Sequence, residues 1–562
     1  MSSDHKGDAV ISLSDYLKDM KAWSAKNRLR LNERKSELIH LSSQFRATET
    51  LPDLNTGEVI LQTSNSVKEL GVTLDSHPTL QSHILCDGNT PPRSLILFMF
   101  CFTNSNKKVP PGPWLLPFVR YRFGSGLVHE TFVEVAKKYG PVFSVRRGPF
   151  LCVVLNDKES LKEALVKSGE FFSDRFVTGS LRWTIPDTIK KATVTWSNGK
   201  PWKDLRNFCL NVFHSFSIDE ASLESRINLE ARYMAEEIRN HDSRPMVISG
   251  LLNKVTGNIM AQLIFGHRFD YDDVEFTAAL RIMAEAGAFI GEHDPVNVFE
   301  RLIHAPRYKP FREMITKLKI FIQSQLSVNR ETFQKDHIRH FVDAFLADDI
   351  SEEYKWKDFW RIAFDVFTGG TENAAVFASW AILLLAVHPD VQHKMQSELD
   401  AVVGDGRQPT TNDRSNLPYS EATLMEIMRI RPVLPLSLPH MTSADVTLGP
   451  YTIPKGTIVI PNLWAVHHDP KDWCDPYVFN PDRFLSEDGQ TVLNNDALMP
   501  FSIGRRDCPG SQLGKMETFL LFTNLFQQFE FKLPPDQPTH NTRGLLGLTL
   551  QPEPYKICAV ER

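Results

Sequence analysis

The sequence predicts a mainly α-helical fold with a smaller strand-rich lobe, preceded by an N-terminal extension of different composition. Helices are predicted because apolar residues recur at helical spacing in six stretches, at residues 155–169, 218–240, 251–265, 309–330, 355–387 and 510–528. Strands are predicted because short β-branched or aromatic runs lie beside turn-forming residues, at Val142–Val145, Cys152–Leu155 and Thr457–Pro461. One large domain over residues 110–562 accounts for both patterns.

The composition narrows the class of protein. Hydrophobic residues make up 42% and charged residues 23% of the 562 residues, which is enough to build a sizeable core. A net charge of −5 argues against a nucleic-acid-binding protein. Seven cysteines, an odd number without a Cys-x-x-Cys pair, indicate reduced thiols rather than a disulfide framework or a zinc module. There is no run of 18 apolar residues and no signal peptide, so no ordinary transmembrane helix is expected.

The first 109 residues differ from the rest of the chain. Residues 1–90 are polar, with one amphipathic stretch at Leu13–Trp23, and residues 91–109 hold a short apolar run, Leu95–Phe102, followed by a basic hinge. At a helical rise, eight residues cover about 12 Å, well short of a ~30 Å hydrocarbon core. We therefore expect the run to dip into a membrane face without spanning it. Proline fixes the backbone of the following segment, Pro110–Pro113, in an extended form.

The strongest local signal is the segment FSIGRRDCPG at Phe501–Gly510. Gly504 permits a turn that brings backbone N–H groups toward the sulfur of Cys508, and a helix that begins just after it stabilises a thiolate. Arg506 adds a positive charge for an anionic partner. From the cysteine alone, a buried structural thiol is the commoner interpretation.

The segment resembles the haem-binding loop of the cytochrome P450 family, whose pattern is FxxGxRxCxG. The five fixed positions are filled by Phe501, Gly504, Arg506, Cys508 and Gly510. The resemblance implies the P450 fold and a haem b cofactor whose iron is held by the Cys508 thiolate, which favours O–O bond cleavage. Similar segments extend the resemblance over residues 110–562, toward animal microsomal members that act on xenobiotics and steroids: Pro110–Trp114, Lys138–Val142, Gly266–Asp270, Pro454–Thr457 and Trp464–Pro470.

A second family motif, ExxR, is present at Glu426 and Arg429. Spacing of three residues puts the two side chains on one helical face, where they can pair, although such a pair is more often solvated. The resemblance adds Arg483 as the third member of a buried network. Because burying charges costs free energy, this network is expected to have a structural role near the haem loop.

A set of donors resembles the contacts of the haem carboxylates. Trp202 and Arg206 share a helical face, and both can donate hydrogen bonds to a carboxylate. The resemblance groups them with Arg175, His440 and Arg506 as a charge-assisted cradle. For His440 taken alone, a histidine satisfied within the fold is the commoner interpretation.

The oxygen-activating motif is present in altered form at Asp365–Ala374. Gly369, Gly370 and Glu372 match the family pattern, and two adjacent glycines in a helix allow a ligand to approach the backbone. Asn373 stands where the family has a threonine whose hydroxyl helps to deliver protons. We expect Gly370, Glu372 and Asn373 to take part in catalysis, with Glu372 as a proton carrier through water.

The resemblance implies a haem-thiolate monooxygenase that inserts one oxygen atom of O₂ into a small lipophilic substrate, with electrons from NADPH through NADPH-cytochrome P450 reductase. The reductase is expected to bind near Lys200, Lys203 and Arg505. The protein itself is expected on the cytoplasmic face of the endoplasmic reticulum membrane, although its N-terminal membrane anchor is incomplete. Two alternatives stay open: an isomerase or dehydratase acting on a hydroperoxide, because of Asn373, and a non-enzymatic or nonfunctional chimeric haem protein. No nucleic-acid partner is expected. The resemblance gives the candidate substrate-facing residues as Phe367, Gly370, Leu434, Leu438, Leu548 and Thr549.

Residues 11–84 resemble a fragment of a non-LTR retrotransposon reverse transcriptase. The resemblance is carried by Asp15–Trp23, Asn27–Glu37, Val67–Asp75 and His83–Ile84. The catalytic aspartate pair of that family lies upstream of the matched region and is missing, so no polymerase function is expected. A transposon-derived exon or a faulty gene model is favoured over a functional accessory domain for residues 1–90.

Overall fold

The computed structural model describes five short strands before residue 100 and then residues 108–113, 127–147, 150–177, 193–218, 220–291, 303–354 and 356–562. The chain divides into two compact units, Met1–Lys108 and Val109–Arg562.

The first unit contains short strands. β1 (Glu37–Leu41) pairs antiparallel with β5 (Leu95–Met99) and parallel with β4 (Thr63–Ser64), and β2 (Leu54–Asn55) pairs with β3 (Ile60–Leu61). The length of the apolar run at 95–102 was calculated above for a helix. Five of its residues instead lie in a strand. The predicted amphipathic stretch at residues 13–23 lies outside the described residues.

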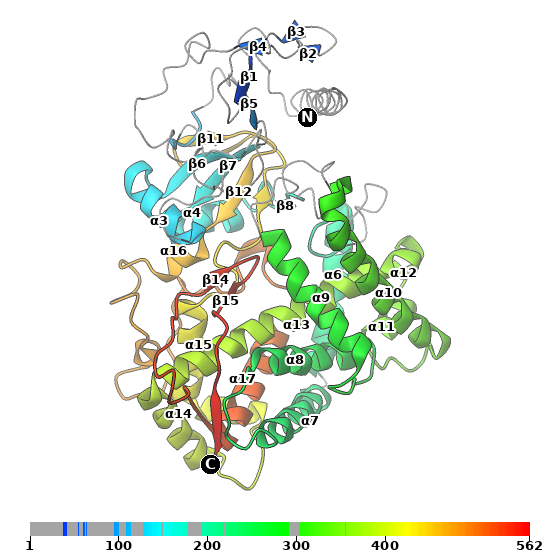
Figure 1. The fold of residues 1–562 in the computed structure, drawn as a ribbon, viewed down its shortest axis with the longest axis vertical. Coiled ribbons are helices and arrows are strands. Elements are labelled where there is room, and N and C mark those ends of the chain that lie inside the picture. Colours follow the sequence, from blue (N-terminus) through cyan, green and yellow to red (C-terminus); the bar gives the residue numbers. More distant parts are fainter. Residues whose placement is uncertain are drawn as a thin grey trace. The chain divides into compact units, whose positions relative to one another are not determined.

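The second unit is mainly helical, as predicted (Figure 1). Its α-helices are α3 (Val128–Tyr139), α4 (Lys158–Lys162), α6 (Gly199–Ile218), α7 (Glu220–Arg239), α8 (Ser249–Ile264), α9 (Val274–Gly291), α10 (Lys309–Glu331), α11 (Phe341–Ala347), α12 (Ile350–Glu353), α13 (Trp356–Val387), α14 (Pro389–Val402), α15 (Pro418–Ile430), α16 (Leu463–His467) and α17 (Ser511–Gln528). Short helical turns are η3 (Glu163–Lys167), η7 (Pro306–Tyr308), η8 (Thr411–Asn416), η9 (Pro481–Phe484) and η10 (Gly504–Arg506).

Five of the six predicted helical stretches agree with observed helices to within about two residues at each end. The stretch at 155–169 differs, because Leu155 still belongs to a strand and α4 passes into a π-type turn, η3, at Glu163. Such turns widen a helix by one residue and often lie near functional sites.

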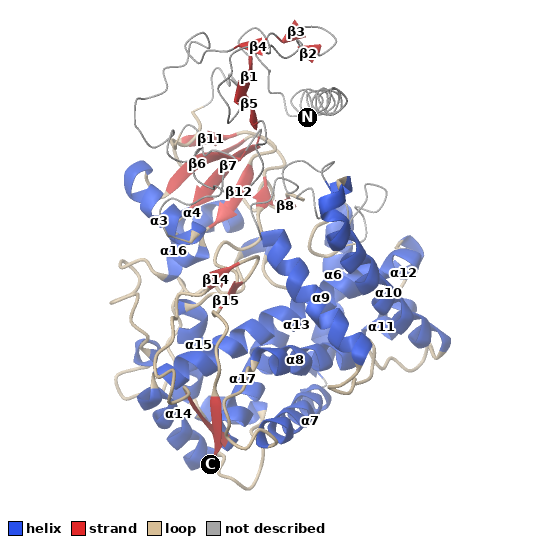
Figure 2. Ribbon diagram, viewed as in Figure 1, coloured by secondary structure: helices blue, strands red, loops and turns tan. Residues whose placement is uncertain are grey.

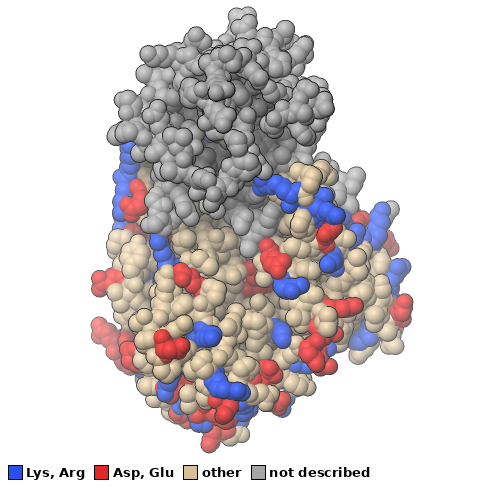
Figure 3. All heavy atoms as spheres, in the orientation of Figure 1, with Lys and Arg blue, Asp and Glu red and all other residues tan. Residues whose placement is uncertain are grey.

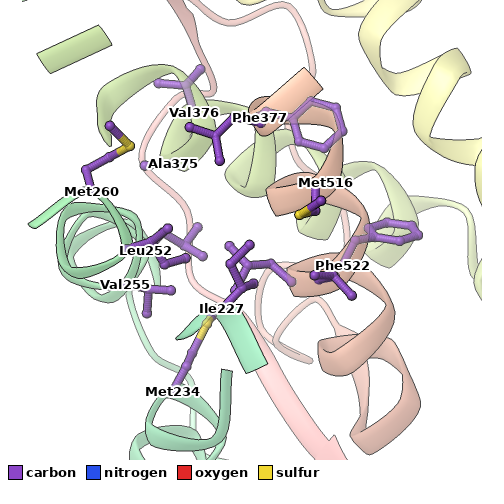
Figure 4. Packing of buried hydrophobic residues seen from close by; sticks show 14 of the residues in the cluster. Ile227, Met234, Leu252, Val255, Met260, Ala375, Val376, Phe377, Met516 and Phe522 are labelled. Carbon is purple, nitrogen blue, oxygen red and sulfur yellow. The ribbon is translucent and has the colours of Figure 1, made fainter. Parts of the chain in front are cut away.

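Helix α13 runs through the middle of the helical body (Figure 1) and packs closely across α8. It is 32 residues long and apolar enough to pass a length and composition test for a membrane span, yet 67% of its most apolar window is buried in the protein. It is therefore a core helix. Figure 4 shows side chains of α7, α8, α13 and α17 meeting in this core, among them Ile227, Leu252, Ala375 and Phe522.

The strands of the second unit gather mainly at one end (Figure 2) in a five-stranded sheet of order β6-β7-β12-β9-β8. Its members are β6 (Val142–Arg147), β7 (Phe150–Leu155), β12 (Ile458–Pro461), β9 (His440–Met441) and β8 (Asp174–Arg175). Small two-stranded pairs complete the unit: β10 (Val446–Leu448) with β11 (Tyr451–Ile453), β13 (Phe529–Lys532) with β16 (Cys558–Glu561), and β14 (Leu545–Leu546) with β15 (Leu550–Gln551).

The proline segment adds to the edge of this sheet. The N–H and hydroxyl of Ser144 on β6 donate to the carbonyls of Pro111 and Pro110, each at 2.8 Å. A Cβ on Gly112 would lie 1.7 Å from the Ser144 carbonyl oxygen, so only glycine fits there. The extended conformation predicted from the prolines is thus used to pin the start of the domain to β6.

Surface charge agrees with the near balance of the composition. On the face seen in Figure 3, the Lys and Arg side chains of the described residues are interspersed with Asp and Glu. Such mixed charges do not form a general polyanion-binding face.

Candidate functional site

The loop Phe501–Gly510 folds back on itself and presents Cys508. The N–H of Cys508 donates to the carbonyl of Phe501 at 3.0 Å, and Gly504 adopts φ +81°. A Cβ on Gly504 would lie 2.0 Å from the carbonyl oxygen of Leu165, in the π-type turn η3. The loop is therefore seated on η3 through a glycine, and α17 begins at Ser511, three residues after Cys508.

The sulfur of Cys508 is surrounded by protein and yet accessible to solvent. Its side chain is exposed, but burial raises the pKa of the thiol above its usual value. The Gly510 N–H and the charge of Arg206 oppose this shift, whereas Asp507 adds to it. Because a coordinated metal ion deprotonates a thiol outright, this sulfur fits an iron ligand.

Strand pairing brings two of the predicted cradle residues together, since Arg175 on β8 lies opposite His440 on β9. Nδ1 of His440 bonds the Phe172 carbonyl at 2.7 Å, which leaves Nε2 buried without a partner in the described part of the chain. Arg175 donates from Nη1 to Leu438 at 2.6 Å, and its Nε is likewise buried and unpaired.

Arg506 joins this group as a second buried guanidinium. It donates to the carbonyls of Ser173 at 2.7 Å and Ser197 at 2.5 Å. Burial first, then the repulsion of neighbouring arginines, lowers the pKa of Arg506 to about 8 and that of Arg175 to about 9. The attraction of Asp174 offsets part of this at Arg506. Two buried cations, of which Arg175 keeps a spare donor at Nε, call for an anion, and the carboxylates of haem fit that need.

Helix α6 contributes Trp202 and Arg206, but to different partners. The guanidinium of Arg506 lies 3.9 Å from the centre of the Trp202 ring, a cation–π contact. Arg206 donates to the backbone carbonyl of Asp507 at 2.7 Å and forms an ion pair with its carboxylate. Arg206 therefore clamps the residue beside Cys508, and the contact of Trp202 and Arg206 with a haem carboxylate stays a prediction.

Glu426, Arg429 and Arg483 form a buried network. Arg429 binds both oxygens of Glu426, at 2.7 and 2.8 Å, and neither side chain is exposed. Nε of Arg483 lies 3.1 Å from the same carboxylate, and the Asn480 N–H donates to it at 2.9 Å. Arg429 also donates to the carbonyls of His467 and Pro476. The network ties α15 to the segment before the cysteine loop, so it holds the fold.

The two glycines of α13 have different surroundings. A Cβ on Gly370 would lie 2.3 Å from Sδ of Met260, so that glycine is needed for packing against α8. Gly369 is exposed, and no described atom lies within 4 Å of the place where its Cβ would be. The expected approach of a ligand to the backbone therefore fits Gly369, whereas Gly370, the residue we had expected, fills a helix contact.

Glu372 and Asn373, the polar residues that follow the two glycines, both form hydrogen bonds within the protein. Nδ2 of Asn373 donates to the carbonyl of Gly369 at 2.8 Å, one turn earlier on the helix. Oε1 of Glu372 accepts from the Thr549 hydroxyl at 3.3 Å and from the Gln551 amide at 3.4 Å. Burial raises the pKa of Glu372 to about 7, and the two donors hold it from rising further. A carboxyl poised there exchanges protons near neutral pH.

Among the expected substrate-facing residues, Phe367 is wrong. It is fully buried, and its ring centre lies 5.7 Å from that of the buried Phe265. Leu434, Leu438 and Leu548 are half-buried, as residues at the edge of an internal space would be.

The sequence did not reveal two polar groups near α13. Gln551 follows Thr549 by two residues, and this strand alternation could have indicated it. Asp365 accepts from the Thr195 N–H at 3.0 Å, and its burial raises the pKa of the carboxyl to about 6. No residue pattern pointed to Asp365, because its partner lies 170 residues earlier in the chain.

Comparison with known proteins decides the family. A family model described as Cytochrome P450 matches residues 108–559. The chain belongs to the cytochrome P450 family. It is 37% identical over 447 residues to cytochrome P450 2U1 of Bos taurus, covering 77% of this chain and 81% of that protein. It is 34% identical over 493 residues to cytochrome P450 2J2 of Homo sapiens, covering 84% and 96%, and 34% identical over 468 residues to cytochrome P450 2J5 of Mus musculus, covering 81% and 92%.

Membership confirms the predicted fold and reaction. This P450 is a haem-thiolate monooxygenase with haem b as cofactor, and it uses O₂, a lipophilic substrate and electrons from NADPH through NADPH-cytochrome P450 reductase. The hydroperoxide-dependent and non-enzymatic alternatives are not favoured. Its relatives of the same group are proteins of the endoplasmic reticulum membrane.

Proposed function

We propose that this P450 is of the animal microsomal type that oxidises xenobiotics, steroids or fatty acids, and that residues 110–562 carry the whole reaction. The observation that carries the proposal is the accessible sulfur of Cys508 beside the buried guanidinium groups of Arg175 and Arg506, of which Arg175 has an unpaired Nε within the described part of the chain. Haem supplies the oxidising chemistry when it is bound. The chain would supply the thiolate ligand, anion-binding donors and a proton-carrying carboxyl.

Each residue of the site has a distinct role in this proposal. Cys508 binds the iron, with Phe501, Gly504 and Gly510 shaping its loop. Arg175, Trp202, Arg206, His440 and Arg506 bind and orient the haem carboxylates, either directly or through their mutual contacts. Glu426, Arg429 and Arg483 support the loop from behind. Glu372 holds a proton near α13, while Gly370 acts through packing and Asn373 through its bond to Gly369.

The reductase is proposed to bind beside the cysteine loop. An open hollow of about 350 Å³ is lined there by Trp202, Lys203, Arg206, Asn207, Arg505 and Asp507. Exposed Lys203 and Arg505 suit an acidic partner. Lys200 contributes less than we expected, because it is already bound to Asp204 at 2.6 Å and Glu353 at 3.0 Å.

The N-terminal residues have no part in the reaction under this proposal. We infer that residues 1–90 are a reverse-transcriptase-like, transposon-derived segment, and that residues 91–109 and the domain surface seat the protein on the cytoplasmic face of the endoplasmic reticulum membrane. Flotation with liposomes, with and without residues 91–109, tests the second statement. Equal haem content and activity of residues 91–562 and of the full chain would support the first.

Replacement of Cys508 tests the central assignment. Cys508→Ser is expected to abolish the absorbance band of the reduced, carbon-monoxide-bound haem thiolate for which the family is named, together with NADPH-dependent turnover. Cys474→Ser is the matched control, because Cys474 is also exposed but lies outside the site. A Cys508→Ser protein that kept the thiolate spectrum would refute the assignment. Spectral titration with steroid, fatty-acid and aromatic ligands would then narrow the substrate class.

A further inference from the structure

Glu372 of α13 is enclosed by two other elements of the fold, α9 and the C-terminal hairpin. Its carboxyl oxygens lie 2.9 and 3.0 Å from the place where a Cβ on Gly287 of α9 would be, so α9 covers it closely. Thr549 and Gln551, from the C-terminal hairpin, contact Oε1 from another side. The carboxyl is thus caged by a glycine and two neutral donors.

The hairpin presents its two donors in a fixed position. Gln551 lies in β15, and Thr549 immediately precedes that strand. The two residues are separated by the fully buried Leu550, so their side chains point to the same side of the strand. The Leu550 carbonyl accepts from Nε1 of Trp380 at 2.8 Å, and its N–H donates to Val433 at 2.8 Å. Trp380 lies on α13, the helix of Glu372, so that helix itself fixes the strand.

The cluster is closed by a third contact. The Gln551 amide donates to the Thr549 hydroxyl at 3.2 Å, so all three polar groups touch one another. Thr549 is only 3% exposed, which leaves its hydroxyl little choice of partner other than Glu372 and Gln551. Such a buried network has a defined geometry, since each unmet donor or acceptor would be costly.

We propose that Thr549 is a positioning residue that supplies, from outside the helix, the hydroxyl group that position 373 of α13 lacks, and that with Gln551 it holds the Glu372 carboxyl in place for proton transfer. This proposal rests on the proposed function of Glu372 as a proton carrier. Asn373 does not position Glu372, because its amide donates to the Gly369 carbonyl instead.

The electrostatics of the cage agree with this role. Burial is the largest cause of the raised pKa of Glu372, and Thr549 and then Gln551 lower it. The charged groups of the packed elements have other contacts: Arg281 with Glu285 at the surface of α9, Lys254 of α8 over the Tyr271 ring, and Asp365 of α13 with Thr195. Loss of the Thr549 hydroxyl should therefore raise the pKa of Glu372.

The experiment is an infrared pH titration of the carboxyl band in the haem-loaded full chain at rest, with Glu372→Gln used to assign the band. Thr549→Val is expected to raise the pKa of Glu372 by about one unit, the equivalent of one hydrogen bond to a charged group. Thr549→Ser is expected to restore the wild-type value. Thr256→Val is the matched control, because the Thr256 hydroxyl donates at 2.9 Å to the carbonyl of Thr371, next to Glu372, without touching the carboxyl.

Turnover separates this proposal from the function on which it rests. In Thr549→Val, the pH at which product formation per NADPH falls should move upward with the infrared pKa, and Thr549→Ser should reverse the change. An unshifted titration in Thr549→Val, or the same shift in Thr256→Val, would overturn the role of Thr549. Unchanged product per NADPH in Glu372→Gln would instead overturn the proton-carrier role of Glu372, while leaving the infrared result of Thr549→Val intact.

Discussion

A lone carboxyl in the core of the second unit gives a sharp prediction about stability. Glu517 on α17 is 2% exposed, and its Oε1 has no hydrogen-bond partner among the described residues. Burial alone raises the pKa of this carboxyl to about 8. Since the unfolded chain ionises it near pH 4.5, the folded state binds the proton more tightly, and stability contributed by the neutral form is lost as pH rises toward 8.

The magnitude follows from proton linkage. Each pH unit between the two pKa values is worth about 1.4 kcal/mol, so raising the pH from 6 to 7.5 should lower the free energy of unfolding by about 2 kcal/mol through this one group. Glu517→Met keeps the side-chain length and removes the charge, so it should not show this loss. Glu517→Gln should lack the pH dependence too, but gain less stability, because its amide is buried without a partner.

The assay is urea unfolding at pH 6 and at pH 7.5, with wild type and variants compared at equal haem content. Glu230→Gln serves as the contrasting control. Its carboxylate is buried but bound to Arg268 at 2.9 Å and to Tyr271 at 2.6 Å, so its loss should destabilise at both pH values. If wild type and Glu517→Met change in parallel with pH, the argument about Glu517 is wrong.

The other predictions concern the buried network and the glycines of α13. Glu426→Gln leaves the buried Arg429 guanidinium without its counter-charge, and should lower the free energy of unfolding by about 3–5 kcal/mol in urea titrations and reduce haem content; stability within 1 kcal/mol of wild type would contradict the structural role. Arg483→Met should cost less, because Arg429 still binds both oxygens of Glu426. Gly370→Ala should destabilise by roughly 1–3 kcal/mol through its clash with Met260, and Met260→Ala should relieve part of that cost. Gly369→Ala should leave stability equal or up to about 1 kcal/mol higher but weaken ligand binding in spectral titrations, and a larger loss of stability than in Gly370→Ala would reverse the assignment of the two glycines.

Much of the site was predictable where chemistry and spacing are local. The pattern from Phe501 to Gly510 carries its own turn and helix start, and the Glu426–Arg429 pair follows from a spacing of three on one helix. Helix lengths such as that of α13 followed from apolar periodicity, because a helix buried on most sides must repeat its apolar residues every turn.

The rest depended on which distant segments meet. Two adjacent glycines look alike in the sequence, and only the packing of α8 shows that Met260 occupies the flank of Gly370. The bond of Arg206 to Asp507, 301 residues away, does not follow from the spacing of Arg206 and Trp202. Phe367, a substrate-facing candidate by resemblance, is fully buried in the core.

The amino-acid sequence by itself determined the helical body and the strand-rich lobe, since each rests on neighbours within about ten positions. The resemblance to the family predicted the thiolate and the buried network, whose Arg483 lies 57 residues from Glu426. Only the tertiary structure decided the environment of Glu372, the pairing of Arg175 with His440, and the isolation of Glu517. These depend on desolvation and on contacts between segments up to a few hundred residues apart, and such contacts leave no periodic or local signal in the chain.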